Sequence, residues 1–209
     1  IKVENVSEKT SSSELDHIFK GQLDAAGITT EDSSKKFKFI HLNGAHVPYI
    51  YDKEMNIINE WDGTYEQSTQ ATLFGAMDYV EQLRESGAYD NTVIIVMSDH
   101  GFNGSLVQSG DATWMRQCAM LLIKGRNEHH DTMQISQAPI SFEDLQEAYV
   151  RLLDGEQSDS VFDWKEGDLR ERRFLRYSFL DDSHMQEYMQ TGYASDMDTM
   201  ILTGREYNR

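Results

Sequence analysis

The segment Thr92–Met97, Thr-Val-Ile-Ile-Val-Met, constrains the fold of this chain more than any other part of the sequence. An unbroken β-branched run of this kind is typical of a strand that is covered on both faces within a parallel sheet. Cys118–Ile123 is a second apolar run of the same type. Strands covered on both faces need helices on either side of the sheet, so the two runs predict an α/β fold.

Three segments repeat apolar residues at helical spacing, and a glycine follows the last turn of each. They are Ser13–Ala26, the segment from Thr64 to Gly87, and the segment from Ser141 to Gly155. The second is the best marked, because Thr64 and Gln67 have the spacing of a capping box. Helices and strands therefore alternate along the chain, as the α/β prediction requires.

Further strands are predicted on both sides of this central part. Phe37–Leu42 alternates in a way that suits a strand buried on at least one face, and Phe174–Leu180 is another strand. Met185–Gly192 and Asp198–Tyr207 are predicted to form a late antiparallel pair. The predicted fold class is α/β, with a largely parallel central sheet, flanking helices and a C-terminal antiparallel strand pair.

The chain is predicted to form one domain over residues 1–209, because its 209 residues suit a single core. Within it we expect a helix and linker at residues 1–36, an α/β core at 37–155 and C-terminal strands at 156–209. The net charge of −17 repels phosphate backbones, and no basic stripe offsets it, so nucleic-acid binding is disfavoured. The single cysteine, Cys118, allows neither an internal disulfide nor a cysteine metal cluster, and we interpret it as a small buried side chain. The chain shows no signal-like segment and no apolar run long enough to span a membrane.

Asp99 and His100 follow the Thr92–Met97 run directly, and Gly101 comes next. In open α/β sheets ligands bind beyond the carboxyl ends of the strands, so both side chains are predicted at a ligand-binding edge. A carboxylate beside an imidazole suits Zn²⁺ or Mn²⁺ better than Ca²⁺. The alternative interpretation is structural: Asp99 caps the following turn and His100 is a polar loop residue.

His46 lies in a second loop of this kind, after the strand predicted at Phe37–Leu42. A histidine there can donate to a phosphoryl or sulfuryl oxygen, or protonate a leaving group. The alternative is a hydrogen-bonded structural histidine. We keep that structural interpretation for His41, and we place His129 and His130 in a solvated loop.

These segments, in this order, resemble the alkaline-phosphatase/sulfatase superfamily. His41–Tyr49 is similar to the His-x-x-Gly-x-His-x-Pro-Tyr segment of sulfatase-like transferases, and Gly87–Gly101 to their Gly-x-Tyr-Asp-Asn-Thr-x-Ile-Ile-x-x-Ser-Asp-His-Gly segment. Ala119–Lys124 resembles their next strand, and Gln137–Leu153 the segment and helix after it. The similar families are the lipoteichoic-acid synthases, the lipid A phosphoethanolamine transferases and the phosphoglycerol transferases of capsule assembly.

The resemblance implies a fold, an activity and a set of site residues. The fold would be part of an alkaline-phosphatase-like sandwich. The activity would be a metal-dependent transfer or hydrolysis of phosphate or sulfate esters, on a phosphoglycerol or phosphoethanolamine type of substrate in cell-envelope or polysaccharide assembly. Asp99 and His100 match the late pair of metal ligands, and His46 matches the histidine that contacts the substrate phosphoryl group. Membrane anchoring of the full-length protein and an extracytoplasmic location follow from the resemblance alone.

Two departures from the family pattern limit what the resemblance implies. The family's nucleophile and early acidic ligand lie upstream of the first histidine segment, and nothing in residues 1–36 matches them. Phe102–Met115 also lacks the histidine that many relatives carry there. We therefore expect the 209-residue chain to be the C-terminal part of a catalytic domain and inactive alone. The alternatives are a degenerate non-catalytic domain that binds a glycan or a protein, and an unrelated α/β domain with a chance Asp-His-Gly.

Overall fold

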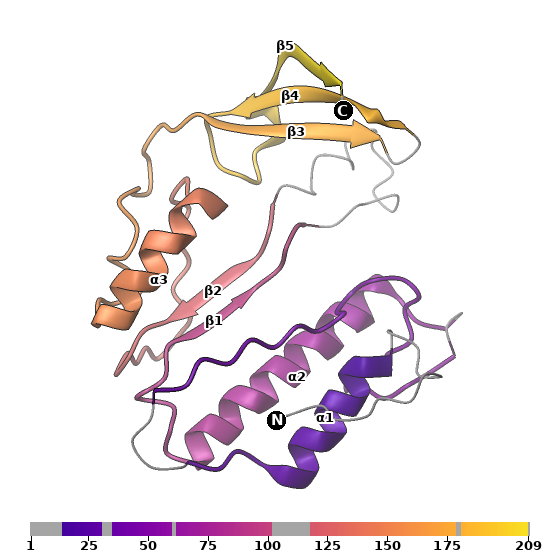
Figure 1. Ribbon diagram of the computed structural model, residues 1–209, viewed down its shortest axis with the longest axis vertical. Coiled ribbons are helices and arrows are strands. Elements are labelled where there is room, and N and C mark those ends of the chain that lie inside the picture. Colours follow the sequence, from indigo (N-terminus) through magenta and orange to yellow (C-terminus); the bar gives the residue numbers. More distant parts are fainter. Residues whose placement is uncertain (1–13, 31–34, 60–61, 102–117, 179–180, 209) are drawn as a thin grey trace. The chain divides into compact units, whose positions relative to one another are not determined.

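The computed structural model describes residues 14–30, 35–59, 62–101, 118–178 and 181–208. The chain divides into two compact units, Ile1–Asn91 and Thr92–Arg209, and each is described here by itself. Figure 1 colours the elements in sequence order. Both units mix helices with irregular or strand segments, which confirms the α/β class in general terms. The expectation of one domain over residues 1–209 stays a prediction.

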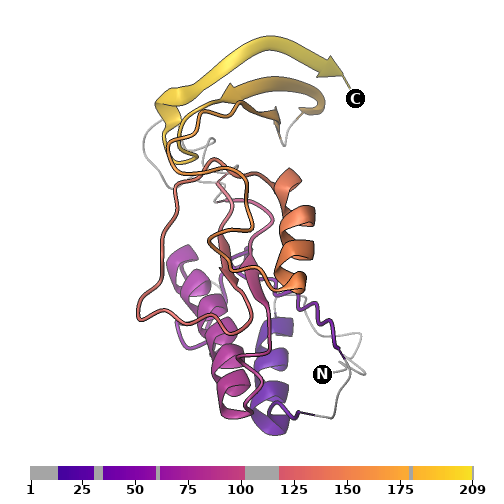
Figure 2. The same ribbon diagram turned by 90° about the vertical axis from the view of Figure 1, so that its left-hand side faces the viewer.

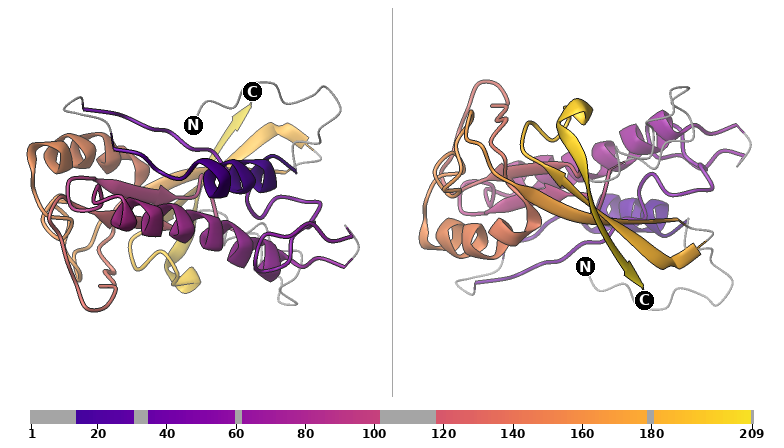
Figure 3. Two further views of the ribbon diagram at one scale, coloured as in Figure 1. Left: turned by 90° about the horizontal axis from the view of Figure 1, so that it is seen from below. Right: turned by 90° about the horizontal axis from the view of Figure 1, so that it is seen from above.

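Two helices lie side by side in the first unit, α1 at Leu15–Ala26 and α2 at Tyr65–Glu85 (Figures 1 and 3). The rings of Phe19 on α1 and Tyr79 on α2 have their centroids 6.5 Å apart. The predicted capping box is confirmed, since Gln67 N donates to Thr64 Oγ1 at 3.2 Å and Thr64 N donates to Gln67 Oε1 at 3.0 Å. Local signals in the sequence thus set the beginning of α2.

The loop between these helices folds back on itself and packs on α2. Ile58 N donates to Ile50 O at 2.8 Å, and Tyr51 pairs with Ile57 in an isolated antiparallel bridge. The buried apolar side chains of this region form one cluster: Ile50, Tyr51, Met55 and Ala71. This small core fixes the segment that follows the loop of His46.

The prediction of a buried strand at Phe37–Leu42 is wrong for the described structure. The segment has no assigned strand, and no described strand pairs with it. Phe37 is 90% exposed and Phe39 is 80% exposed. Alternation predicts burial only where a neighbouring strand and a covering layer exist, and the described part of this unit supplies neither for this segment.

The second unit begins with a pair of short antiparallel strands, β1 at Ile94–Met97 and β2 at Leu121–Lys124. Ile95 lies opposite Ile123 in the register. Helix α3, at Leu145–Asp154, lies beside the pair (Figures 1 and 2). Its side chains Ala148 and Leu152 form a buried cluster with Val161, and both isoleucines pack against this cluster. The strands were correctly located by their apolar runs.

The predicted parallel central sheet is wrong for the described residues, in which both sheets are antiparallel. The β1 residues are half-buried or exposed rather than fully covered. An apolar run shows that a strand packs against something, but the direction of its partner depends on the connection between them. The prediction of a strand covered on both faces therefore went beyond what the run can show.

The predicted start signal of Ser141 and Asp144 is confirmed as a capping box in front of helix α3. A 3₁₀ turn, η3 at Phe142–Asp144, precedes it, and Ser141 N donates to Asp144 Oδ2 at 2.7 Å. The helix ends at Gly155, whose φ of 102° is the left-handed conformation that favours glycine. The Asp144 carboxylate also accepts from Arg170 Nη1 at 2.5 Å, which ties the start of the helix to the segment that leads into the last sheet.

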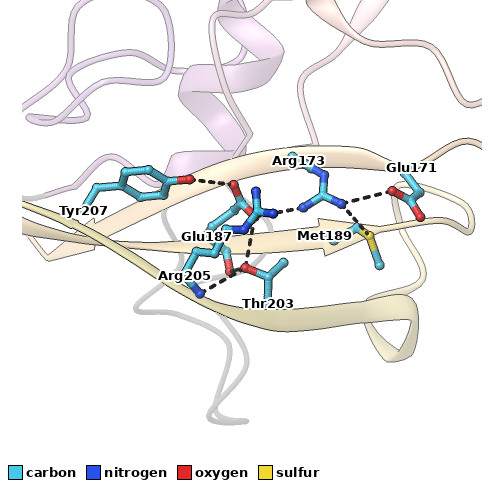
Figure 4. A network of polar contacts seen from close by, with 7 residues as sticks. All are labelled: Glu171, Arg173, Glu187, Met189, Thr203, Arg205 and Tyr207. Carbon is cyan, nitrogen blue, oxygen red and sulfur yellow. Dashed lines mark hydrogen bonds and ion pairs between the residues drawn. The ribbon is translucent and has the colours of Figure 1, made fainter.

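The C-terminal sheet consists of β3 at Arg172–Ser178, β4 at Asp181–Gln190 and β5 at Met200–Asn208, in the order β3-β4-β5 (Figure 2). A short 3₁₀ turn, η4 at Met197–Thr199, precedes β5. The predicted antiparallel pair is confirmed as β4 and β5, and β3 adds a third antiparallel strand. Glu187 on β4 joins the three strands, accepting from Arg173 Nη1 at 2.9 Å, Thr203 Oγ1 at 3.0 Å and Tyr207 Oη at 3.1 Å (Figure 4).

Candidate functional site

The predicted metal ligands, Asp99 and His100, follow the carboxyl end of strand β1. Ser98 N donates to Met120 O at 3.1 Å, and Met120 N donates to Ser98 Oγ at 2.8 Å. The first bond continues the backbone pairing of β1 and β2 by one residue beyond Met97, and the second adds a contact to the Ser98 side chain. Asp99 and His100 therefore begin directly at the carboxyl end of the strand, which is where the sequence predicted them.

Asp99 and His100 lie against each other through several contacts. His100 N donates to Asp99 Oδ1 at 2.9 Å, and His100 Nε2 lies 3.6 Å from Asp99 Oδ2. His100 Nδ1 lies 2.6 Å from Gly101 O. A carbonyl oxygen only accepts hydrogen bonds, so Nδ1 carries the hydrogen and the neutral ring has its lone pair on Nε2. The free nitrogen lone pair and a carboxylate oxygen thus lie side by side.

This arrangement fits two of the ligands of a divalent cation. Zinc lies about 2.0–2.2 Å from nitrogen and oxygen ligands, so two ligand atoms at a tetrahedral angle are roughly 3.4 Å apart. The separation of 3.6 Å between Asp99 Oδ2 and His100 Nε2 is close to this value. Metal-binding histidines also commonly donate their other ring N–H to a backbone carbonyl, as His100 does to Gly101.

Two features of the pair match its structural interpretation equally well. The Asp99 side chain is 88% exposed and that of His100 is 38% exposed. The hydrogen bond from His100 N to Asp99 Oδ1 is a local bond between a side chain and the neighbouring backbone, which a structural role for Asp99 also explains. Among the described residues no group of three or more His, Cys, Asp and Glu side chains is placed to hold a metal ion. The described pair therefore supplies two ligands.

His46 is an exposed residue of the first unit, in the loop after Leu42. Its Nδ1 lies 2.7 Å from Val47 O, so this nitrogen carries the hydrogen, as in His100. The Nε2 atom then accepts a hydrogen bond in the neutral ring and donates one only when the ring is protonated. His46 and the Asp99–His100 pair belong to different units, so their convergence on one site stays a prediction.

Sequence reasoning missed Asp16, whose carboxylate holds the loop of His46. Asn43 N donates to Asp16 Oδ1 at 2.7 Å, and Gly44 N donates to Asp16 Oδ2 at 2.8 Å. Asp16 is 1% exposed, and this burial raises its pKa, against the lowering effect of the two backbone hydrogen bonds. Its spacing of three and seven residues from Phe19 and Leu23 puts a carboxylate on the apolar face of α1, which is a signal that could have revealed it.

Glu128 forms a second buried polar cluster that sequence reasoning missed. The residue is 5% exposed, and it accepts from Gly125 N at 2.6 Å, from His130 Nε2 at 3.0 Å and from both N and Oγ of Ser158. Burial alone would raise the pKa of Glu128, but these hydrogen bonds lower it to about 2. His129 and His130 are exposed, as predicted for a solvated loop, although His130 is tied to Glu128.

The Cys118 thiol is half-buried, and its Sγ donates to Ala194 O at 2.8 Å. Burial raises the pKa of Cys118, partly offset by the nearby Arg172 guanidinium. A raised pKa keeps the thiol protonated, and the thiolate is the nucleophilic form. These features agree with a structural role for Cys118.

No helix in the part of the chain that the structure describes combines the length and the apolarity needed to cross a membrane. Comparisons of the chain with models of protein families, with curated proteins and with solved structures find no match.

Proposed function

We propose that this chain is part of a metal-dependent enzyme that transfers or hydrolyses phosphate or sulfate esters. Asp99 and His100 bind a divalent cation in this proposal, Zn²⁺ or Mn²⁺, and His46 contacts the transferred group. The observation that carries the proposal is the 3.6 Å separation of Asp99 Oδ2 and His100 Nε2, with His100 Nδ1 held by Gly101 O. The ordered resemblance of the sequence to sulfatase-like transferases supports it.

The residues around the pair have defined tasks in this proposal. A bound divalent cation withdraws charge from the ester oxygens and lowers the pKa of the attacking group. His100 offers the Nε2 lone pair, because the hydrogen bond to Gly101 O selects that tautomer. Asp99 offers the Oδ2 oxygen, while His100 N holds its Oδ1 and so limits rotation of the carboxylate.

His46 is suited to meet an anionic group. Residues 33–51 contain no Asp or Glu, although the chain has 36 acidic residues in all, so the segment itself adds no carboxylate that would repel a phosphate or sulfate. The carboxylate that contacts it, Asp16, is buried and accepts from the backbone N–H groups of Asn43 and Gly44. His46 Nε2 donates to such an oxygen when the ring is protonated, because the Nδ1 hydrogen is used by Val47 O.

The finer parts of the proposal rest on the resemblance. They are a partial alkaline-phosphatase-like sandwich, a phosphoglycerol or phosphoethanolamine type of substrate, a nucleophile outside the matched segments, and action at the outer face of a bacterial-type membrane. Turnover of a phosphate or sulfate monoester by the purified 209-residue chain would contradict the placement of the nucleophile.

A second candidate function is a non-catalytic sulfatase-like domain that binds a glycan or a protein. The observation in its favour is that the described residues supply only two metal ligands, both with exposed or half-exposed side chains. The two candidates differ in metal binding, because the enzyme needs the cation at Asp99 and His100 and the binding domain does not.

Calorimetric titration of the purified chain with Zn²⁺ and with Mn²⁺ tests the proposal. We expect Asp99→Asn and His100→Gln each to weaken binding about tenfold or more, since each removes one ligand. His184→Gln is the matched control, because His184 Nε2 also lies 3.6 Å from a carboxylate oxygen, Glu206 Oε1, in an exposed pair. Equal affinity of the wild type and the two site variants would reject the enzyme proposal in favour of the binding domain.

A further inference from the structure

The Asp16 carboxylate is an ionisable group enclosed by the first unit at the start of α1. It is 1% exposed, and each of its two oxygens accepts from a different backbone N–H, those of Asn43 and Gly44. Burying a carboxylate is unfavourable unless hydrogen bonds compensate for its lost hydration. A carboxylate also accepts at both oxygens, whereas an amide accepts at one, so two converging N–H groups select Asp over Asn at this position.

The turn that Asp16 holds leads directly to His46. Gly44, two residues before His46, has a φ of 65°, in the left-handed region that favours glycine. The backbone reverses here, and the reversal is fixed by the two hydrogen bonds to Asp16 rather than by a neighbouring strand. Among the described residues, the backbone groups of Asn43, Gly44 and His46 form no backbone–backbone hydrogen bond.

The next residue of the helix holds the other end of the same segment. His17 N donates to Tyr51 Oη at 3.3 Å, and His17 Nδ1 lies 3.0 Å from Met55 O. Helix α1 thus forms hydrogen bonds with the chain before His46 through Asp16 and with the chain after His46 through His17. The histidine lies between two anchored points, and both anchors belong to one turn of helix.

We infer that Asp16 is the positioning residue for His46: its carboxylate fixes the Asn43–Gly44 turn and thereby sets where the His46 ring is presented and which ring nitrogen is free. The inference rests on the proposed function for the role of His46 in contacting the transferred group. The contacts that support it all lie within the first unit. Asp16 acts through the backbone of the loop, because its two carboxylate oxygens accept from Asn43 N and Gly44 N.

Nitrogen-15 NMR of the whole chain tests this inference without any assay of activity. The variants are Asp16→Asn, Asp16→Glu and, as a matched control, Asp52→Asn. Asp52 also accepts from two backbone N–H groups, those of Glu54 at 3.0 Å and Asn56 at 2.9 Å, but it is only half-buried and follows His46. The measurements are the hydrogen-exchange rates of Asn43 and Gly44 and the ring tautomer of His46 from its nitrogen shifts.

For Asp16→Asn we expect exchange at Asn43 and Gly44 to accelerate about tenfold or more, and His46 to populate both neutral tautomers. Asp16→Glu keeps the charge and both acceptors, so it should restore part of the protection and of the tautomer preference. Asp52→Asn should leave both measurements as in the wild type. A purely structural role for Asp16 would change stability without changing the tautomer of His46.

Two outcomes would overturn the inference. One is a folded Asp16→Asn variant with wild-type exchange at Asn43 and Gly44 and a wild-type His46 tautomer. The other applies if Asp16→Asn unfolds α1, in which case the Asp16→Glu variant is the test. Fast hydrogen exchange at Asn43 and Gly44 together with a wild-type His46 tautomer in Asp16→Glu would overturn the inference. Metal titration tests Asp99 and His100, which belong to the other unit. If those residues do not bind metal, the proposed function is rejected, but the NMR result on Asp16 and His46 is unaffected.

Discussion

Glu128 accepts two hydrogen bonds from Ser158, a residue 30 positions further along the chain, one from its backbone N at 3.2 Å and one from its hydroxyl. The contact joins the loop after β2 to the segment after α3. A carboxylate that is 5% exposed and receives hydrogen bonds from Gly125, His130 and Ser158 is well compensated for its burial.

The Glu128 cluster predicts sensitivity to acid. Its folded-state pKa of about 2 lies below the ordinary value of 4.5, so the ionised group contributes its full stabilisation above pH 4.5 and loses it as the pH falls from 4.5 towards 2. A pKa difference of this size corresponds to at most about 3 kcal/mol. We expect Glu128→Gln to lower the free energy of unfolding at pH 7 and to approach the wild type near pH 2, as measured by urea denaturation.

The matched control for this experiment is Glu166→Gln, because Glu166 is exposed. Its effect should be small at every pH. If Glu128→Gln and the wild type differed by the same amount at pH 7 and pH 2.5, the hydrogen bonds to Ser158, His130 and Gly125 would not be the source of the stabilisation.

Two glycines of the first unit should respond differently to the same substitution. A Cβ at Gly63 would lie 1.8 Å from Tyr49 O, a backbone atom that moves only with the whole loop. A Cβ at Gly75 would lie 2.8 Å from the terminal methyl of Met55, which is flexible, and alanine also favours the α2 helix by about 1 kcal/mol. We expect Gly63→Ala to cost about 2 kcal/mol or more and Gly75→Ala to stay within about 1 kcal/mol of the wild type.

Thermal unfolding followed by far-ultraviolet circular dichroism checks this pair, since both helices of the unit contribute to the signal. A larger loss of stability for Gly75→Ala than for Gly63→Ala would contradict this prediction. It would mean that the Met55 side chain cannot move away from the added Cβ, whereas the loop around Tyr49 can.

The helices were predictable because their signals are local. The capping box of Thr64 and Gln67, the Ser141 cap and the glycine after α3 all lie within a few residues of the boundary that they set. The positions of β1 and β2, and the antiparallel pairing of β4 with β5, also followed from runs of suitable residues. These features depend on the sequence near each element.

The wrong and missing predictions concern contacts between distant residues. The parallel direction expected for the β1 sheet and the burial expected for Phe37–Leu42 both assumed partners that an apolar pattern does not specify. Asp16 and Glu128 act through residues about 30 positions away, so no spacing rule marks their partners. For the candidate site, the adjacency of Asp99 and His100 follows from the sequence, whereas their relation to His46 depends on the arrangement of the two units.

The C-terminal sheet should depend on Glu187, which links all three strands (Figure 4). Burial alone would raise the pKa of Glu187, but hydrogen bonds from Thr203, Tyr207 and Arg173 lower it. The stabilisation that the ionised group contributes is therefore present above the ordinary glutamate pKa and lost as the pH falls below it. We expect Glu187→Gln to lower the Tm at pH 7 more than at pH 3.

Glu206→Gln is the control for this prediction, because Glu206 lies on β5 with its side chain 55% exposed. Its Tm should stay close to that of the wild type. An equal fall in Tm for the two variants would show that the loss of a negative charge, rather than of the shared acceptor, weakens the sheet.

Zinc should stabilise the chain through Asp99 and His100. A ligand that binds only the folded state at 100 times its Kd raises the free energy of unfolding by about 2.7 kcal/mol. We expect excess Zn²⁺ to raise the Tm of the wild type and of His184→Gln, and EDTA to reverse the effect. The Asp99→Asn variant should show a clearly smaller rise, because its amide oxygen is a weaker ligand than the Oδ2 carboxylate oxygen beside His100 Nε2. If Zn²⁺ raised the Tm of Asp99→Asn as much as that of the wild type, the cation would be bound at other side chains, and the 3.6 Å pair would have to be explained by the local hydrogen bond from His100 N to Asp99 Oδ1 alone.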